Sequence, residues 1–340
     1  MPTSFKTAFI AAKEKAVRYK ERQTHHSFRV TRRRDYRRRL QLPGLWEFTL
    51  GVNKLLWKQR KVFIVLVVVY ALLSGLLVGV GSQGSYVQAS ELIGQTGQDA
   101  FEGDWSQLTS AGILFASIAT TGLNQTPSEG QQIYAALLGL LVWLTAVWLL
   151  RAIVAGHKVR VRDGLYQAGA PIVPTLLIGL VLVVQLLPLA LAVLAYSAAS
   201  ASGLLASGVE AMLFWFAAAL LAVISLYWMT STFLAAVIVT LPGMYPWKAL
   251  RAASEIVVGR RLRILSRILW MFLCVAVAWA IVLIPFIVLD TWLRSVWDVL
   301  QAVPVIPVVI LLLSTASVVW VASYIYLLYR KIVDEDAHEA

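Results

Sequence analysis

Six long runs of apolar residues divide the chain. Each run holds 19 or more residues with no charge at its centre, and about 20 apolar residues are enough for a helix to cross the hydrocarbon of a bilayer. Polar residues collect in the stretches between the runs. The pattern therefore predicts six transmembrane helices, over residues 62–80, 134–155, 172–196, 211–240, 264–289 and 303–329.

Two stretches outside these runs have the pattern of helices that lie on a membrane surface. In residues 41–61, a narrow stripe with Lys54 and Lys58 adjoins a wide apolar face that contains Trp57. Residues 246–258 form the second stretch, which begins with a proline and has separate apolar and basic faces. A wide apolar face beside a thin charged stripe is typical of an interfacial helix.

The same order of elements recurs along the chain. Leu-Pro-Gly opens both surface stretches, at 42–44 and 241–243, and each stretch passes a basic cluster into an apolar run. The loop 157–171 has a shortened version of this order. We therefore predict an all-α integral membrane protein, whose six transmembrane helices form three hairpins with amphipathic helices at the inner face.

Composition agrees with this fold class. Hydrophobic residues make up 59% of the 340 residues and charged residues only 14%, whereas soluble domains carry about 25% charged residues. A chain of this size cannot hide so much apolar surface in one core. Soluble globular and disordered classes are therefore excluded.

The basic residues predict the orientation. Of the 30 lysines and arginines, 27 lie before the first run, between the second and third, between the fourth and fifth, or after the sixth. Arg151 and Arg267 lie within runs, near the ends that adjoin these same segments, and only Arg294 falls on the other side. Lys and Arg are enriched in cytoplasmic segments. We expect both termini in the cytoplasm, and a bias this strong favours a bacterial inner membrane.

The expected organisation follows from these assignments. It comprises a basic cytoplasmic tail, an interfacial helix, a six-helix membrane domain and an acidic cytoplasmic tail, at 1–40, 41–61, 62–330 and 331–340. The largest external loop is 81–132. Its apolar stretch 108–122 is too short to span a bilayer and fits either a re-entrant or an interfacial helix.

The formal net charge of +12 is concentrated on the predicted inner face. Each Lys or Arg near an anionic leaflet contributes about 1 kcal/mol, so membrane lipids, anionic on the cytoplasmic face, are the expected partners. RNA is the alternative partner of the tail, but a nucleic-acid module with an aromatic stacking platform is not evident. The candidate lipid contacts are Arg32, Arg33, Arg34, Arg37, Arg38, Arg39, Lys248, Arg251, Arg260, Arg263 and Arg267.

The centres of the six runs hold few polar residues. Gln185 lies close to Pro188 in the third run, and the fourth run contains Thr230, Ser231 and Thr232. Hydrogen bonding between helices is one interpretation of these residues. A substrate cavity beside Gln185 is the other.

Catalytic and cofactor motifs do not stand out. The sequence has no Gly-rich phosphate loop with lysine, no nucleophile elbow and no His-Glu-x-x-His. Its one cysteine, Cys274, excludes an intrachain disulfide. We predict no catalytic residue, cofactor or metal site. An integral lipid enzyme would require Asp163, Glu255 and Arg260 to meet at the inner face.

One stretch resembles a known family. Residues 241–268 are similar to the interfacial motif of small bacterial six-helix membrane proteins, such as the membrane domain that accompanies some glycerophosphoryl diester phosphodiesterases. The residues that carry the resemblance are Tyr245, Pro246, Ala249, Leu250, Ser254, Glu255, Gly259 and Arg260. The resemblance implies a fold over about 42–330, and no activity, because the family's hydrolysis belongs to a separate barrel domain.

These features together predict a non-enzymatic role. We expect membrane organisation, lipid interaction or an accessory subunit, with a protein partner or a second copy as further candidates. The alternative is a permease or exporter for an uncharged or lipid-like substrate, built on the third and fourth helices. A cavity beside Gln185 would favour that alternative.

Overall fold

The computed structural model describes residues 42–79, 129–202, 208–296 and 305–339. All regular secondary structure within these ranges is helical. The predicted tail 1–40 and the stretch 108–122 lie outside them. The helices are α2 (Leu45–Lys58), α3 (Arg60–Leu77), α6 (Glu129–Val154), α7 (Val161–Gln167), α8 (Ile172–Ala201), α9 (Gly208–Ile238), α10 (Pro246–Val257), α11 (Arg261–Val296) and α12 (Val305–Glu339).

Six of these helices are long and apolar enough to cross a membrane: α3, α6, α8, α9, α11 and α12. They coincide with the six predicted runs, so the predicted fold class is confirmed and the chain is a multi-pass membrane protein. Several helices extend beyond the predicted runs. Residues 129–132, 290–296 and 331–339 are helical, and the last two stretches contain no proline or glycine that would end a helix.

Both predicted surface helices form, as α2 and α10. Pro246 occupies the first turn of α10, where its missing N–H leaves no hydrogen bond unmade. Gly259 then has a φ of +80°, which only glycine adopts readily, and it turns the chain from α10 into α11. The short helix α7 occupies the corresponding place between α6 and α8.

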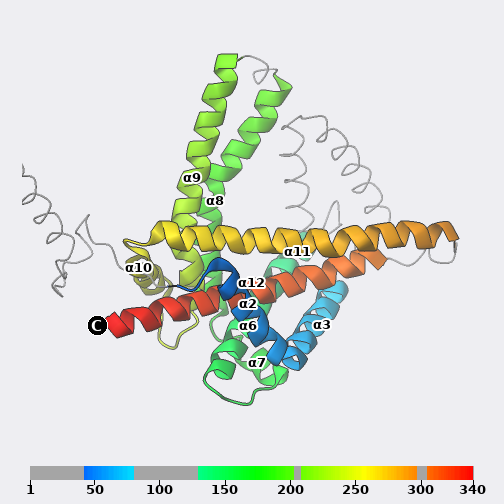
Figure 1. Cartoon of the computed structure of the whole chain (residues 1–340), viewed down its shortest axis with the longest axis vertical. Coiled ribbons are helices and arrows are strands. Elements are labelled where there is room, and N and C mark those ends of the chain that lie inside the picture. Colours follow the sequence, from blue (N-terminus) through cyan, green and yellow to red (C-terminus); the bar gives the residue numbers. More distant parts are fainter. Residues whose placement is uncertain (1–41, 80–128, 203–207, 297–304, 340) are drawn as a thin grey trace, which may run out of the picture.

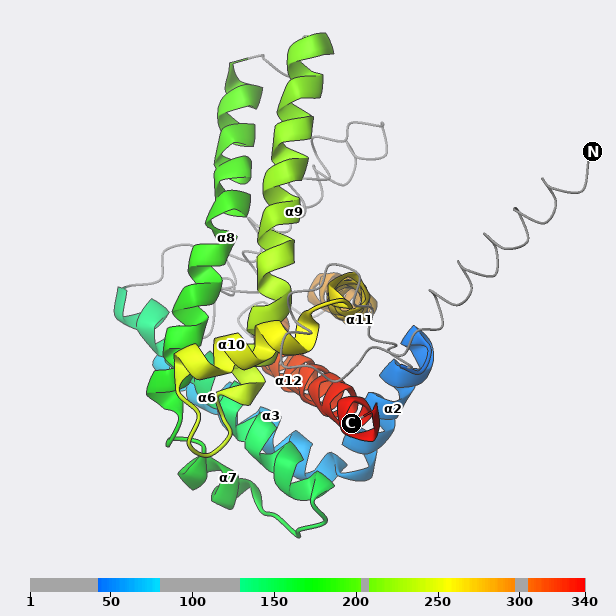
Figure 2. The same cartoon turned by 90° about the vertical axis from the view of Figure 1, so that its left-hand side faces the viewer.

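Consecutive long helices pack against each other in three pairs: α3 with α6, α8 with α9, and α11 with α12. The three predicted hairpins are therefore present. They are not parallel: the α8–α9 pair extends away from the other helices and runs transverse to α11 and α12, which lie lengthwise in Figure 1 and nearly end-on in Figure 2.

The lengths of these helices fit a crossed arrangement. The helices α8, α9, α11 and α12 contain 30, 31, 36 and 35 residues, which is about 45–54 Å at 1.5 Å per residue. The hydrocarbon core is about 30 Å thick. Helices of this length still cross it when tilted by about 45°, so pairs that tilt in opposite directions can share one bilayer.

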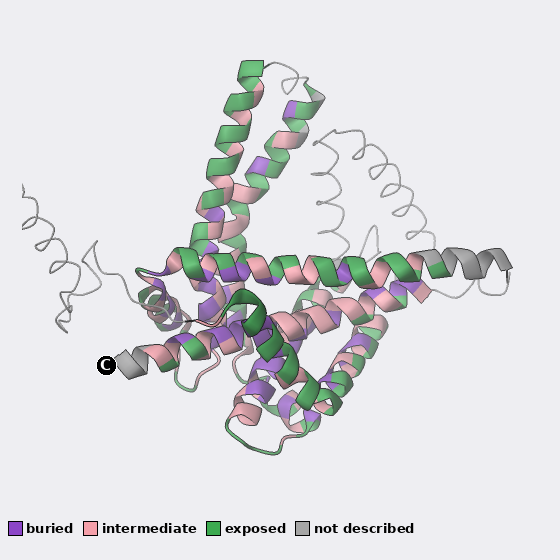
Figure 3. Cartoon of the chain, viewed as in Figure 1, coloured by how far each residue is buried: buried purple, intermediate pink, exposed green. Residues whose placement is uncertain are grey.

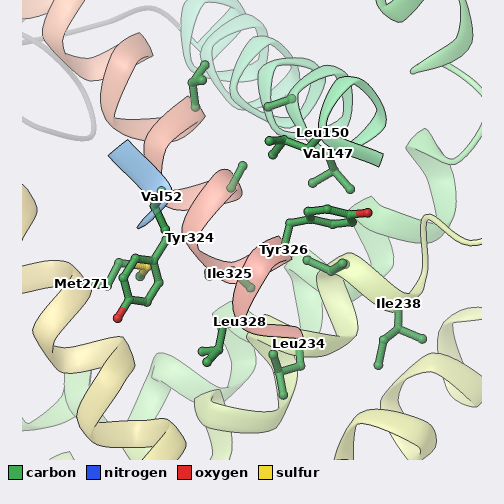
Figure 4. Close-up of a cluster of buried hydrophobic side chains, with 14 of the residues drawn as sticks. Val52, Val147, Leu150, Leu234, Ile238, Met271, Tyr324, Ile325, Tyr326 and Leu328 are labelled. Carbon is green, nitrogen blue, oxygen red and sulfur yellow. The ribbon is translucent and has the colours of Figure 1, made fainter. Parts of the chain in front are cut away.

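The core lies around α12, which packs against α2, α3, α6, α9 and α11. Figure 4 shows Tyr324 and Tyr326 of α12 on different sides of the helix, Tyr324 beside Met271 of α11 and Tyr326 toward Leu150 of α6. In the α8–α9 pair, fewer residues are buried with increasing distance from the other helices, and the far ends are mostly exposed (Figure 3). The buried core therefore lies where one end of the α8–α9 pair meets the other helices.

Candidate functional site

Polar residues of α8 and α9 join the two helices. The hydroxyl of Thr232 donates a 2.7 Å hydrogen bond to Oε1 of Gln185. Pro188 lies inside α8, and the next backbone N–H, that of Leu189, donates to Oγ of Ser225 in α9 at 3.1 Å. The polar groups beside the proline are thus used in helix packing.

The other two residues of the predicted intramembrane group bond to their own helix. Oγ1 of Thr230 donates to the carbonyl of Leu226 at 2.8 Å, and Oγ of Ser231 donates to the carbonyl of Trp228 at 3.1 Å. The structure therefore brings only one of the three, Thr232, to Gln185. These contacts support the packing interpretation of the group.

The buried face of α10 is made of small residues. Ala249, Ala253 and Val257 recur every four residues and are fully buried, which lets α10 lie close against α9. Trp247 of the same helix is 80% exposed. Small side chains permit this close approach, so they face α9 and the larger indole is directed away from the protein.

The polar face of α10 is exposed. Lys248 and Arg251 are both candidate lipid contacts and both lie on the surface. Nε of Arg251 lies 3.4 Å from Oε1 of Glu255, one turn later. The pair is solvent-exposed and therefore contributes little to stability, which leaves these cations accessible to a headgroup.

The three candidate lipid contacts near the start of α11, Arg260, Arg263 and Arg267, have different environments. Arg263 is exposed, as a headgroup contact requires. Arg260 and Arg267 are only 3% and 7% exposed. Nε of Arg260 donates to the carbonyl of Ile256 at 2.8 Å, which ties the end of α10 to the start of α11. Two of the three predicted lipid contacts thus point into the protein.

Arg267 lies at a junction between the start of α2, α11 and α12, which we call the inner junction. Its Nη2 donates a hydrogen bond to the carbonyl of Pro43, just before α2. Its guanidinium lies over the ring of Phe48, 5.5 Å from the centroid. That ring packs edge-on against Tyr324 of α12 at 4.8 Å. One cation thus contacts all three elements.

Side-chain hydrogen bonds hold α2 against the inner junction. Nε1 of Trp270 in α11 donates to Oγ1 of Thr49 at 3.1 Å, and Nε1 of Trp320 in α12 donates to Oδ1 of Asn53 at 2.8 Å. These contacts join residues more than 200 positions apart. Periodicity along one helix cannot reveal them.

Large apolar residues of α2 that lie outside its buried face are exposed, although Trp46 also packs edge-on against Trp270 of α11. Trp46 and Trp57 are 66% and 72% exposed, and Leu50 is also exposed between them. Lys54 and Lys58 are exposed nearby. Trp residues prefer the boundary between hydrocarbon and headgroups, so α2 has one face for the protein and one suited to the interface.

A small apolar crevice lies farther along α11 and α12. It has a volume of about 210 Å³ and is open on one side. Nε1 of Trp279 donates to Oγ of Ser317 at 2.8 Å across it. Its lining comes from α6, α11 and α12: Trp143, Val275, Trp279, Ser314, Ser317, Val318 and Val321.

The acidic residues considered for enzymatic chemistry are engaged locally. Oδ2 of Asp163 accepts a hydrogen bond from the backbone N–H of Arg160 at 3.3 Å, at the start of α7. Glu255 pairs with Arg251 of its own helix. Among the described residues, no group of three His, Cys, Asp or Glu side chains could hold a metal ion.

The comparisons with known proteins assign no family. No protein-family model, curated protein or solved structure matches the chain. The resemblance of 241–268 to the phosphodiesterase-associated membrane domain therefore stays a likeness of motif. The identification that the structure supports is that of a multi-pass membrane protein with six apolar helices.

Proposed function

We propose that this protein is a non-enzymatic lipid-binding protein of a bacterial inner membrane, with anionic headgroups bound at its cytoplasmic face. The observation that carries the proposal is the outward surface of α2 and α10. It combines exposed indoles, Trp46, Trp57 and Trp247, with exposed cations on the same helices. Indoles enter the interface and lysines attract anionic lipid.

Contacts between helix ends support the grouping of these segments on one side of the membrane in this proposal. Nη1 of Arg151, near the end of α6, donates to the carbonyl of Thr240, just after α9, at 3.2 Å. Arg267, near the start of α11, bonds to Pro43 before α2. In each case the bond joins two segments that the charge distribution assigns to the same side of the membrane.

The transport alternative is weaker on the same observations. It needs a path beside Gln185, and there α8 and α9 are joined by the hydrogen bonds of Gln185 and Leu189. Those bonds favour a structural role for the third and fourth apolar helices. Lipid binding accounts for the exposed faces of α2 and α10, whereas transport does not.

The proposal is tested by lipid retention of the full-length protein in detergent, measured by native mass spectrometry. We expect the protein to retain phosphatidylglycerol over phosphatidylcholine with the same acyl chains. Changing Lys54, Lys58 and Lys248 together to Gln should lower phosphatidylglycerol retention about tenfold or more, because each cation near the headgroups contributes about 1 kcal/mol.

The matched control keeps the charge. The triple change of Lys54, Lys58 and Lys248 to Arg should retain phosphatidylglycerol as the unchanged protein does. Equal retention of the two lipids by the unchanged protein would refute anionic-lipid binding at this face.

A further inference from the structure

The apolar crevice between α6, α11 and α12 lies at the middle of the membrane-spanning segments. Its lining includes Trp143 of α6, Val275 of α11 and Val318 of α12, and each of these residues lies near the centre of its apolar run. Apolar runs of this length cross hydrocarbon about 30 Å thick. The surroundings of the crevice at this depth are therefore lipid tails, and neither bulk water nor headgroups.

The polar groups that line the crevice are already engaged within the protein. Nε1 of Trp143 donates to the carbonyl of Ala236 in α9 at 3.3 Å, and Nε1 of Trp279 donates to Oγ of Ser317 at 2.8 Å. The hydroxyls of Ser314 and Ser317 donate to carbonyls about one turn earlier in α12, at 2.9 and 2.7 Å. A buried water needs about two to four polar partners. Because few polar atoms remain available here, the lining favours a ligand without polar groups.

The size of the crevice suits a piece of a hydrocarbon chain. Trp279 is 1% exposed and lies deepest among the lining residues, whereas Val275, Val318 and Val321 are partly exposed. The volume of about 210 Å³ is larger than that of an apolar cavity of about 150 Å³ that binds benzene. An empty space of this kind forfeits the dispersion contacts of its lining atoms. A run of several methylenes restores those contacts, whereas a fused-ring lipid is too large for the space.

We propose that this crevice binds a segment of one acyl chain of a membrane phospholipid. Both α6 and α11 pack on α12, and all three helices contribute to the lining, so the bound chain contacts all three. Half of the hydrocarbon thickness separates the middle of the bilayer from the ester groups of the lipid. The bound segment is therefore the methyl end of the chain. The inference goes beyond the proposed function, because this site recognises hydrocarbon and makes no use of the headgroup.

The test locates the chain by photolabelling of the full-length protein. The protein is purified in a steroid-based detergent, which offers no alkyl chain as a competitor. It is mixed with an equimolar amount of phosphatidylcholine that carries a diazirine near the methyl end of one acyl chain. After irradiation, mass spectrometry of peptides identifies the labelled residues. We expect the label on crevice-lining residues of α11 and α12, and its loss from them when the diazirine lies beside the ester group instead.

Two matched substitutions in α11 test whether the crevice itself holds the chain. Val275→Phe should lower the labelling about tenfold, because a phenyl ring fills most of the space, as benzene fills an apolar cavity of about 150 Å³. Val277→Phe makes the same change at a position of α11 that is 48% exposed, and it should leave the labelling unchanged. Ser314→Leu fills the crevice from α12 and should lower the labelling as Val275→Phe does.

Binding in the crevice is overturned by uniform labelling of the exposed apolar faces of α8 and α9. It is also overturned by an equal fall in Val275→Phe and Val277→Phe, or by unchanged labelling in both Val275→Phe and Ser314→Leu. Thermal unfolding of the three variants establishes that they are folded. Phosphatidylcholine carries no net charge, so this experiment is independent of anionic-headgroup binding, and either proposal can fail while the other stands.

Discussion

The arginines at the start of α11 show how far the role of a single residue depends on the elements packed beside it. Arg263 and Arg267 are separated by about one turn, yet the first is exposed and the second is buried against Phe48. Counting cations along the sequence predicts on which side of a membrane they lie. It gives no information on which of them face lipid and which face the protein, because that depends on the partner helices.

A residue-scale prediction concerns the bond between α8 and α9. Changing Thr232 to Val should destabilise the protein by about 0.6 kcal/mol, and by no more than about 2 kcal/mol, because hydrogen bonds between membrane helices contribute this much on average. The measurement is a double-mutant cycle with Gln185→Leu, followed by unfolding in a denaturing detergent.

Ser231 supplies the control for this cycle. Its hydroxyl bonds to the carbonyl of Trp228 in its own helix, so Ser231→Ala should show no coupling to Gln185→Leu. Coupling of equal size at Ser231 and Thr232 would contradict the interhelical bond.

The elements themselves were the most predictable level of the structure. Long apolar runs give α3, α6, α8, α9, α11 and α12, since only helices satisfy every backbone group within a segment in hydrocarbon. Surface helices α2 and α10 follow from their two-faced pattern. The ends were less predictable, as α11 and α12 continue past the apolar runs through polar residues of adequate helix propensity.

Candidate site residues were less predictable than the helices. The sequence singled out Gln185 and Thr232, which do meet. It missed Phe48 and Tyr324, because aromatic residues in apolar stretches are unremarkable by themselves. Only the packing of α2 on α11 and α12 makes them neighbours of Arg267, and the signal for that packing is tertiary.

An element-scale prediction concerns how α7 lies on α6. A Cβ atom placed on Gly164 would lie 3.1 Å from Cγ of Leu149 and 3.1 Å from Cγ2 of Thr145. Gly164→Leu should therefore destabilise the protein by about 1–3 kcal/mol through overpacking, and hydrogen exchange over 161–167 should become faster.

The control for this change is a glycine with open space. A Cβ on Gly139 of α6 meets nothing within 4 Å, so Gly139→Ala should be neutral or stabilise by about 0.5–1 kcal/mol through the lower entropy of the unfolded chain. Equal destabilisation by both changes would mean that α7 does not pack closely on α6.

At the scale of the whole molecule, the arrangement predicts which positions face the two sides of the membrane. On a Cys274→Ser background, Lys58→Cys should react with a membrane-impermeant maleimide only after the cells are opened, because Lys58 ends the inner-face helix α2. Glu210→Cys, at the far end of the α8–α9 pair, should react in intact cells. The reverse pattern would overturn the predicted orientation.

The inner junction also constrains how the protein is made. Pro43 and Arg267 are 224 residues apart, and Asn53 and Trp320 are 267 apart, so α2 leaves the ribosome long before its partners exist. At roughly 5–20 residues per second, α2 waits about 10–45 s for Arg267. Its exposed indoles and lysines allow α2 to bind the membrane surface during that interval. The helix therefore docks late, and the order of synthesis makes the inner junction one of the last parts of the molecule to assemble.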